Sequence, residues 1–111
     1  MNDLNSVIIV GKTTKKYKTL DNNSVEFSID VSRTYLNDGK LCKEISNFDI
    51  FCIDSLAKKI QKIPKRHFAN QIVQITGRLR STKWKTKKRV YIFAENINFQ
   101  NVIKGFYNES L

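Results

Sequence analysis

The clearest periodicity in the sequence lies between residues 25 and 35. Every second residue from Val25 to Val31 is apolar, and the residues between them are charged or small and polar. A period of two is typical of a strand with one face on the core and the other in solvent. The dipeptide Asp38-Gly39 follows, and it accepts the positive φ angles of a tight hairpin turn. The pattern predicts a strand over 25–35 that turns back at this dipeptide.

Four further segments are predicted to be strands. Residues 7–11 form an unbroken β-branched run closed by a glycine, which is typical of a buried strand. Residues 45–53 carry apolar side chains on both faces, so we expect the core to cover one face and a partner or ligand the other. Residues 73–80 and 90–99 complete the set, the first of them with a clear alternation.

A short helix is predicted between the third and fourth strands. Apolar residues recur at helical spacing from Leu56 to Ile63. Asp54 or Ser55 is expected to cap the first turn, and Pro64 to stop the helix.

Five short strands with one helix between the third and fourth have the element order of the OB-fold. The predicted fold class is therefore all-β with one short helix, a five-stranded OB-fold Greek-key barrel. We expect this domain to span residues 1–100, followed by a short C-terminal extension over 101–111.

The charge balance adds a class of partner. Twenty Lys or Arg stand against ten Asp or Glu, a formal net charge of +10, and this excess indicates a polyanionic partner. The sequence has no apolar run of about 18 residues and no long basic amphipathic helix, so no membrane partner is expected. No signal or transit peptide is visible. We expect a cytoplasmic, nucleoid-associated protein, or an organelle-matrix protein if the chain is a processed form.

The basic residues are densest in the stretch from Gly77 to Arg89. It holds seven Lys or Arg in thirteen residues, no acid, and Trp84, the only tryptophan. Cations bind any polyanion through counterion release, whereas an aromatic face among them can stack an unpaired base, worth roughly 1–3 kcal/mol. The stretch is predicted to form one arm of a hairpin between the fourth and fifth strands, with a basic turn, at the centre of a single-strand-binding surface.

Nothing in the sequence indicates catalysis. Asp49 and Asp54 lie on opposite strand faces or across a strand end, and His67 has no partner nucleophile or metal-ligand cluster. Cys42 and Cys52 are too few for a disulfide framework and lack metal-ligand spacing. We expect a reduced, non-enzymatic protein with Cys52 packed in a strand and no cofactor.

Six pieces of the chain, in order, resemble the bacterial and mitochondrial single-stranded DNA-binding proteins. The resemblance runs from about Leu4 to Phe99. The six pieces are Leu4 to Gly11, Phe27 to Tyr35, Asn47 to Ile50, Ser55 to Lys58, Gly77 to Trp84 and Ala94 to Ile97. Each piece is degenerate alone, but together they form a specific signal.

The resemblance implies an OB-fold protomer, usually of a homotetramer, around which single-stranded DNA wraps with little sequence preference. Trp84 and Tyr35 match stacking positions of the family. The basic residues that fall where the family places phosphate-facing cations are Arg33, Arg78, Arg80, Lys83, Lys85, Lys87 and Lys88. Lys12 is a further candidate phosphate contact, although a solvated loop explains it equally well.

The chain departs from the family pattern at two stacking positions, where Asn47 and Ile53 stand in place of aromatic residues. Phe51 faces the same way as Asn47 in the predicted strand and is a candidate replacement ring. Phe48 matches a position that the family uses near its subunit interface. Asn47, Phe51 and Ile53 remain open between groove lining and subunit packing.

The ending of the sequence is not the acidic tip by which bacterial members recruit replication and repair enzymes. The resemblance therefore implies binding and protection of single-stranded DNA in replication, recombination and repair, without support for recruitment through such a tail. A primosomal accessory protein of the same fold and an RNA-binding OB domain remain alternatives.

Overall fold

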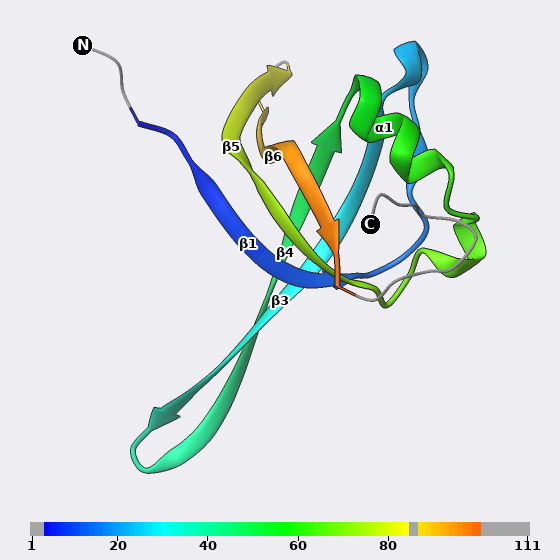
Figure 1. Cartoon of the computed structure of the whole chain (residues 1–111). Coiled ribbons are helices and arrows are strands. Elements are labelled where there is room, and N and C mark those ends of the chain that lie inside the picture. The colour runs from blue at the N-terminus through cyan, green and yellow to red at the C-terminus, as the bar shows by residue number, and fades with distance from the viewer. Residues whose placement is uncertain (1–3, 85–86, 101–111) are drawn as a thin grey trace.

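The computed structural model describes residues 4–84 and 87–100, except for the side chains of Lys83 and Trp84. Six strands and one α-helix follow each other along the chain (Figure 1). They are β1 (Val7–Thr13), β2 (Lys18–Thr19), β3 (Val25–Asn37), β4 (Lys40–Cys52), α1 (Asp54–Gln61), β5 (Ile72–Trp84) and β6 (Lys87–Phe99). Two 3-10 turns, Asp21–Asn23 and Lys65–His67, lie in the connections. The predicted extension over 101–111 lies outside the described residues.

The strands form one sheet that closes on itself. Its order is β1-β5-β6-β4-β3-β2, and β1 pairs with β3 as well, which closes five strands into a barrel. The β4–β6 pair is parallel and every other pair is antiparallel. The predicted five-stranded OB-fold barrel with one helix is confirmed. The two-residue strand β2, which pairs with the start of β3, was not predicted.

Alternation along the strands builds the core. The odd-numbered residues of β3 from Val25 to Ile29 are buried, as predicted, and Cys52 is buried at the end of β4. Phe68, which follows the second 3-10 turn, is fully buried and packs edge-to-face against the rings of Tyr17 and Phe27 at centroid distances of 5.2 and 5.1 Å. Helix α1 buries Ala57 and Ile60 in the same core cluster.

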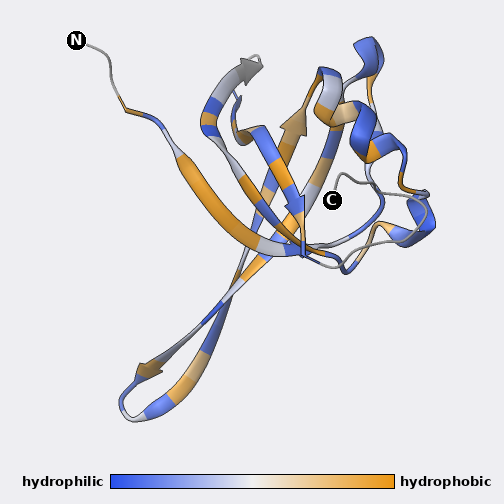
Figure 2. Ribbon diagram, viewed as in Figure 1, coloured by the Kyte–Doolittle hydropathy of each residue, from blue (hydrophilic) through white to orange (hydrophobic). Residues whose placement is uncertain are grey.

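Two local predictions are wrong. The first strand is buried on one face only, because Ile8 and Val10 are 70 % and 48 % exposed, although β1 is apolar along most of its length (Figure 2). Helix α1 starts after Ile53, which occupies the N-cap position without a side-chain hydrogen bond, and Asp54 is its first residue. Neither Asp54 nor Ser55 therefore caps the helix. The helix ends at Gln61, before Pro64.

The basic stretch belongs to a hairpin of the last two strands, as predicted. Strand β5 continues to Trp84 and β6 begins at Lys87, so most of the stretch belongs to two paired strands. Trp84 and Lys87 are partners in the β5–β6 register, as are Lys83 and Lys88. The basic residues thus line a long hairpin, with only residues 85–86 lying between its two strands.

Strand β6 changes the phase of its alternation within its length. Up to Ala94 its buried residues are even-numbered, and from Ile97 onward they are odd-numbered. The β5–β6 register skips Glu95, which makes it the extra residue of a β-bulge. At this point β5 carries Gly77, where a Cβ would lie only 2.2 Å from the backbone oxygen of Phe93. The bulge and the glycine together bring the two backbones unusually close.

Strands β3 and β4 extend beyond the barrel as a two-stranded arm (Figure 1). Asp38 and Gly39 form its turn with φ angles of 53° and 75°, which confirms the predicted hairpin. Leu36 and Leu41, which pair across the arm, are more than 70 % exposed. Every residue from Ser32 to Leu41 is exposed, so the arm has solvent on both sides.

Candidate nucleic-acid interface

A row of four side chains crosses the outer face of the barrel. Glu26 of β3 is the register partner of Phe51 on β4, Phe51 is the parallel partner of Phe93 on β6, and Phe93 is opposite Arg78 on β5. Because directly opposed residues share a face of a sheet, these four lie on one surface. The row alternates with residues that face the core, such as Ile50 and Ile92, both buried.

Three rings on this face form what we call the aromatic patch: Phe51, Tyr91 and Phe93. The centroids of Phe51 and Tyr91 are 5.8 Å apart with an interplanar angle of 66°, and those of Phe51 and Phe93 are 6.3 Å apart at 32°. All three residues are half-buried. The patch therefore exposes part of its aromatic surface while its rings hold one another in place.

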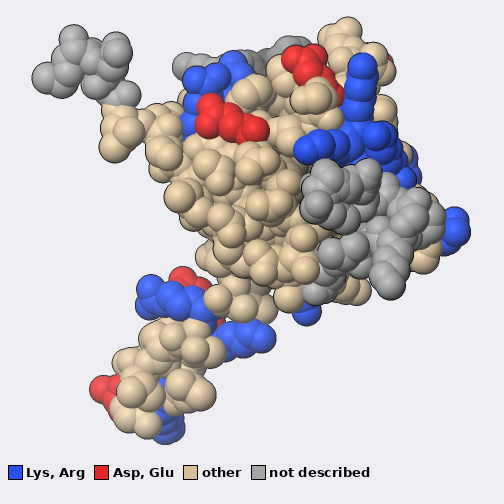
Figure 3. Space-filling model, in the orientation of Figure 1, with Lys and Arg blue, Asp and Glu red and all other residues tan. Residues whose placement is uncertain are grey.

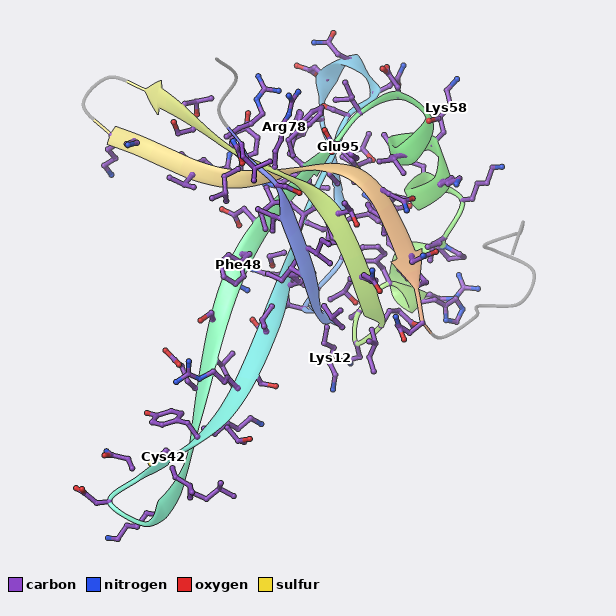
Figure 4. The ribbon with its side chains drawn as sticks, turned by 60° about the vertical axis from the view of Figure 1, so that its left-hand side comes forward. Lys12, Cys42, Phe48, Lys58, Arg78 and Glu95 are labelled. Carbon is purple, nitrogen blue, oxygen red and sulfur yellow. The ribbon has the colours of Figure 1, made fainter. Side chains whose placement is uncertain are left out.

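Guanidinium groups flank the patch on the β5 side. The Cζ atoms of Arg78 and Arg80 lie 5.4 and 5.0 Å from the ring centroid of Phe93. Arg78 also approaches Glu95 at 3.8 Å, and Figure 4 shows the two side chains next to each other above the barrel. A pair this exposed contributes little. Among the described residues no carboxylate lies within salt-bridge distance of Arg80, so its charge is available to an anion.

On the other side of the patch, Arg89 of β6 reaches across to two carboxylates. Its Nη2 atom pairs with Glu26, and it lies 3.5 Å from Oδ2 of Asp49 on β4. These three residues, with Phe51 and Tyr91, line a cavity of about 200 Å³.

A second, more open hollow of about 470 Å³ continues from this cavity and shares Glu26 and Asp49 with it. Its far rim carries Lys15, Lys16 and Lys18, from the loop and short strand after β1. Asn47 lines it as well and donates a hydrogen bond of 2.8 Å to the carboxylate of Asp30. The two hollows and the aromatic patch thus form one continuous track across the outer face.

The structure brings together only part of the predicted site. Phe51, Arg78 and Arg80 meet at the aromatic patch. Exposed Lys87 and Lys88 begin β6, on the same β5–β6 hairpin. Lys85 and the side chains of Lys83 and Trp84 lie outside what the structure describes, so their predicted roles stay predictions.

Other predicted residues lie away from the aromatic patch. Arg33 and Tyr35 are exposed on the arm, where the guanidinium lies 5.1 Å from the tyrosine ring centroid and 3.8 Å from Glu44. Lys12 is exposed at the far end of β1 from Arg78 (Figure 4). Their DNA contacts stay predictions.

Tyr91 and Phe93 were not predicted as site residues, and Arg89 was predicted only as part of the basic stretch. In the structure these three residues alternate with buried Ile92 and Ala94 and therefore face outward. The run from 90 to 94 is so uniformly apolar that it did not reveal which side faced the core. The ion pairs of Arg89 join three strands and left no local signal.

Further Lys and Arg side chains lie outside the track. Figure 3 shows Lys and Arg side chains on the arm and around α1, where Lys58 and Lys59 are exposed.

Burial raises the pKa of the Cys52 thiol to about 12 and raises the pKa of Tyr17. Both groups are therefore neutral at physiological pH, and neither lies on the track.

No helix among residues 4–84 and 87–100 is long and apolar enough to cross a membrane. Within the same residues, no group of three or more His, Cys, Asp or Glu is placed to hold a metal ion.

The barrel topology defines an OB-fold protein. The aromatic patch and the guanidinium groups that flank it form a surface of the kind that binds oligonucleotides. The chain is 30 % identical over 105 residues to the single-stranded DNA-binding protein of Staphylococcus epidermidis, with 88 % of this chain and 77 % of the relative covered. It belongs to the single-stranded DNA-binding protein family. No family model matches the sequence.

Solved structures agree on the fold. The single-stranded DNA-binding protein of Plasmodium falciparum, solved in complex with single-stranded DNA, superposes with a TM-score of 0.78 at 18 % identity, covering 91 % of this chain and 98 % of that chain. A small single-stranded DNA-binding protein from Mycoplasma pneumoniae gives a TM-score of 0.65 at 20 % identity, covering 91 % and 99 %.

Proposed function

We propose that this protein binds and protects single-stranded DNA, with little sequence preference, in replication, recombination and repair. The observation that carries the proposal is the aromatic patch with Arg78 and Arg80 beside Phe93. Rings offer faces to unpaired bases of any identity, and the cations next to them neutralise the phosphates that connect those bases. Membership of the single-stranded DNA-binding protein family supports the same conclusion.

Stacking and charge have separate tasks on this surface. Each unpaired base that stacks on a ring contributes roughly 1–3 kcal/mol, and this term does not depend on salt. Each phosphate neutralised by Lys or Arg releases counterions, which makes the affinity fall with salt at a slope of about −0.7 per contact for a single strand. Duplex DNA keeps its bases stacked inside the helix, so only the charge term is available to it.

The track gives the bound DNA strand a path that is longer than the aromatic patch. From Arg80 the path passes Phe93 and Phe51 and then the cavity beside Arg89. It continues along the hollow rimmed by Lys15 and its neighbours. We propose that Trp84 on the β5–β6 hairpin and Tyr35 on the arm add stacking sites at the margins of this path, with Arg33 and the hairpin lysines as further phosphate contacts.

The test is a competition among oligo-dT, duplex DNA and RNA of the same length at one fixed salt concentration. A labelled oligo-dT is bound first, and each unlabelled competitor is added in turn. Oligo-dT should displace the label at far lower concentration than the duplex does. Equal competition by duplex would contradict the proposal, and stronger competition by RNA would assign the surface to RNA instead.

We also propose that the protein forms a homo-oligomer, with a tetramer expected from the family resemblance. The support lies on β1. Residues 7–11 pair with β5 along one edge only, and the outward side chains of Ile8 and Val10 are largely exposed. An apolar strand with a free edge is a surface that invites pairing with a second copy.

Light scattering of the wild type and of Ile8→Asp tests the oligomer. The wild type should have a mass several times that of one chain, and the charge on β1 should lower it. Leu36→Asp, which places the same charge on an equally exposed position of the arm, is the matched control and should leave the mass unchanged. A wild type that scatters as a monomer would contradict this proposal without affecting the DNA-binding one.

A further inference from the structure

The cavity beside the aromatic patch combines features that a phosphate site would not have. Its lining includes the carboxylates of Glu26 and Asp49, the guanidinium of Arg89 and the rings of Phe51 and Tyr91, with Thr82 of β5 opposite Arg89 in the register. At about 200 Å³ it is smaller than the roughly 300–1,000 Å³ of sites for drug-sized ligands. Its size and its two rings match a single small, flat group.

The charges in the cavity do not cancel. Two carboxylates face one guanidinium, which leaves a local excess of one negative charge in a chain whose net charge is +10. Glu26 is the closer partner of Arg89, whereas Asp49 lies 3.5 Å away and its side chain is 41 % exposed. Asp49 therefore keeps acceptor capacity toward the cavity. A phosphate is repelled here, but a neutral donor is attracted.

We propose that this cavity is a base-binding pocket that takes an unpaired nucleobase with an exocyclic amino group. The base lies against Phe51 and Tyr91, its amino group donates a hydrogen bond to Asp49, and its neighbouring ring nitrogen or carbonyl accepts from Arg89. A carboxylate that accepts from the amino group of cytosine is a known pairing in nucleic-acid recognition. The proposal rests on the proposed binding of single-stranded DNA and adds a base preference to it.

Cytosine and thymine separate this pocket from general stacking, because they have the same ring size. Cytosine presents an amino donor, which matches the carboxylate of Asp49. Beside it cytosine has two acceptors, which match the guanidinium of Arg89. Thymine presents a carbonyl oxygen where cytosine has its amino group, and this oxygen would face Asp49. A correct donor–acceptor pair is worth about fivefold or more in discrimination. The preference should therefore appear as tighter binding of oligo-dC than of oligo-dT.

The experiment measures the affinity of oligo-dC and oligo-dT of equal length at one salt concentration and neutral pH, by fluorescence anisotropy. Wild-type protein and Asp49→Asn are compared, and the ratio of the two affinities is the readout. The wild type should favour oligo-dC, and Asp49→Asn should reduce the ratio about fivefold. Glu44→Gln is the matched control, since Glu44 is also an arginine-paired acid of β4 but lies on the arm. It should leave the ratio unchanged.

A chemical probe tests the pocket in the wild-type protein, so that the result does not depend on the folding of a variant. Oligomers of N4,N4-dimethylcytosine keep the ring and its stacking but have no amino hydrogen to donate. They should bind no better than oligo-dT. Equal binding of oligo-dC and oligo-dT by the wild type, or full retention of the preference with the dimethylated base, would overturn the pocket while leaving the proposed function intact. Failure to bind any of the oligomers would overturn the proposed function itself.

Discussion

Replacing Phe93 by leucine isolates the stacking contribution of the aromatic patch. Leucine keeps most of the apolar volume against Phe51 but removes the flat face that lies 5.0 and 5.4 Å from two guanidiniums. The charges of Arg78 and Arg80 remain. The substitution therefore removes an aromatic contact without removing a phosphate contact.

The expected loss follows from the geometry. A stacked base is worth roughly 1–3 kcal/mol. Because Phe93 is half-buried and tilted against Phe51, a base covers only part of its ring. We expect a loss in the lower half of that range, about 1–2 kcal/mol, which is roughly a 5- to 30-fold weaker affinity for oligo-dT.

Fluorescence anisotropy at several salt concentrations measures the affinity and its salt dependence together. Phe93→Leu should lower the affinity at every salt concentration and leave the slope of log K against log salt unchanged. Phe27→Leu, the same replacement in the barrel core, is the control for general loosening. Thermal unfolding shows whether either variant is destabilised beyond the roughly 1.5 kcal/mol of a conservative swap.

The result that would refute this reasoning is a Phe93→Leu variant that binds within twofold of the wild type, or one whose loss disappears at high salt. The first outcome would mean that no base stacks on Phe93. The second would mean that the ring acts only by positioning the guanidiniums.

Three further predictions concern single residues. Arg80→Ala should reduce the salt slope by about 0.7, because one phosphate contact is lost, and an unchanged slope would remove Arg80 from the interface. Gly77→Ala should lower the melting temperature, since its Cβ would lie 2.2 Å from a backbone oxygen of β6 and overpacking costs roughly 1–3 kcal/mol. Gly39→Ala has open space around its Cβ but a φ of 75°, which costs alanine roughly 1–2 kcal/mol, so it should lower the melting temperature for a different reason. Circular dichroism measures both, and a Gly77→Ala variant that melts with the wild type would refute the close-approach argument. In thiol labelling above neutral pH, half-buried Cys42 should react first, while Cys52, whose pKa is raised to about 12, should react only after denaturant is added or at strongly alkaline pH. Equal rates for the two thiols in the folded protein would contradict the buried position of Cys52.

The sequence predicted the barrel well because its strands are mostly half-buried, and half-burial leaves a period of two. Residues 25–31 show this directly. The first strand lacks this period, since a run of β-branched residues has no polar position to reveal which side faces outward. Ile8 and Val10 were therefore assigned to the core, although no described element of this chain covers them.

The site was predicted only in part for a related reason. Arg78, Arg80 and Phe51 carried a local signal or matched the family pattern, and the structure brings them together. The cluster of Arg89 with two carboxylates depends on which strands are neighbours, with β4 and β6 paired in parallel. Such pairing between distant segments leaves no mark in either one.

The bulge at Glu95 divides β6 into two parts, residues 87–94 and 96–99. The residues that face the core in one part are therefore independent of those that face it in the other. With strict alternation, Phe93 would share a face with Ile97 and Phe99, and the strand would have to choose between a core and a binding surface. One extra residue removes that conflict. It follows that this short region tolerates substitution far better than a change in length. Deletion of one residue at 95–96 would turn either the binding rings inward or the core residues outward. Relatives that keep the aromatic patch should therefore keep the spacing between Phe93 and Ile97.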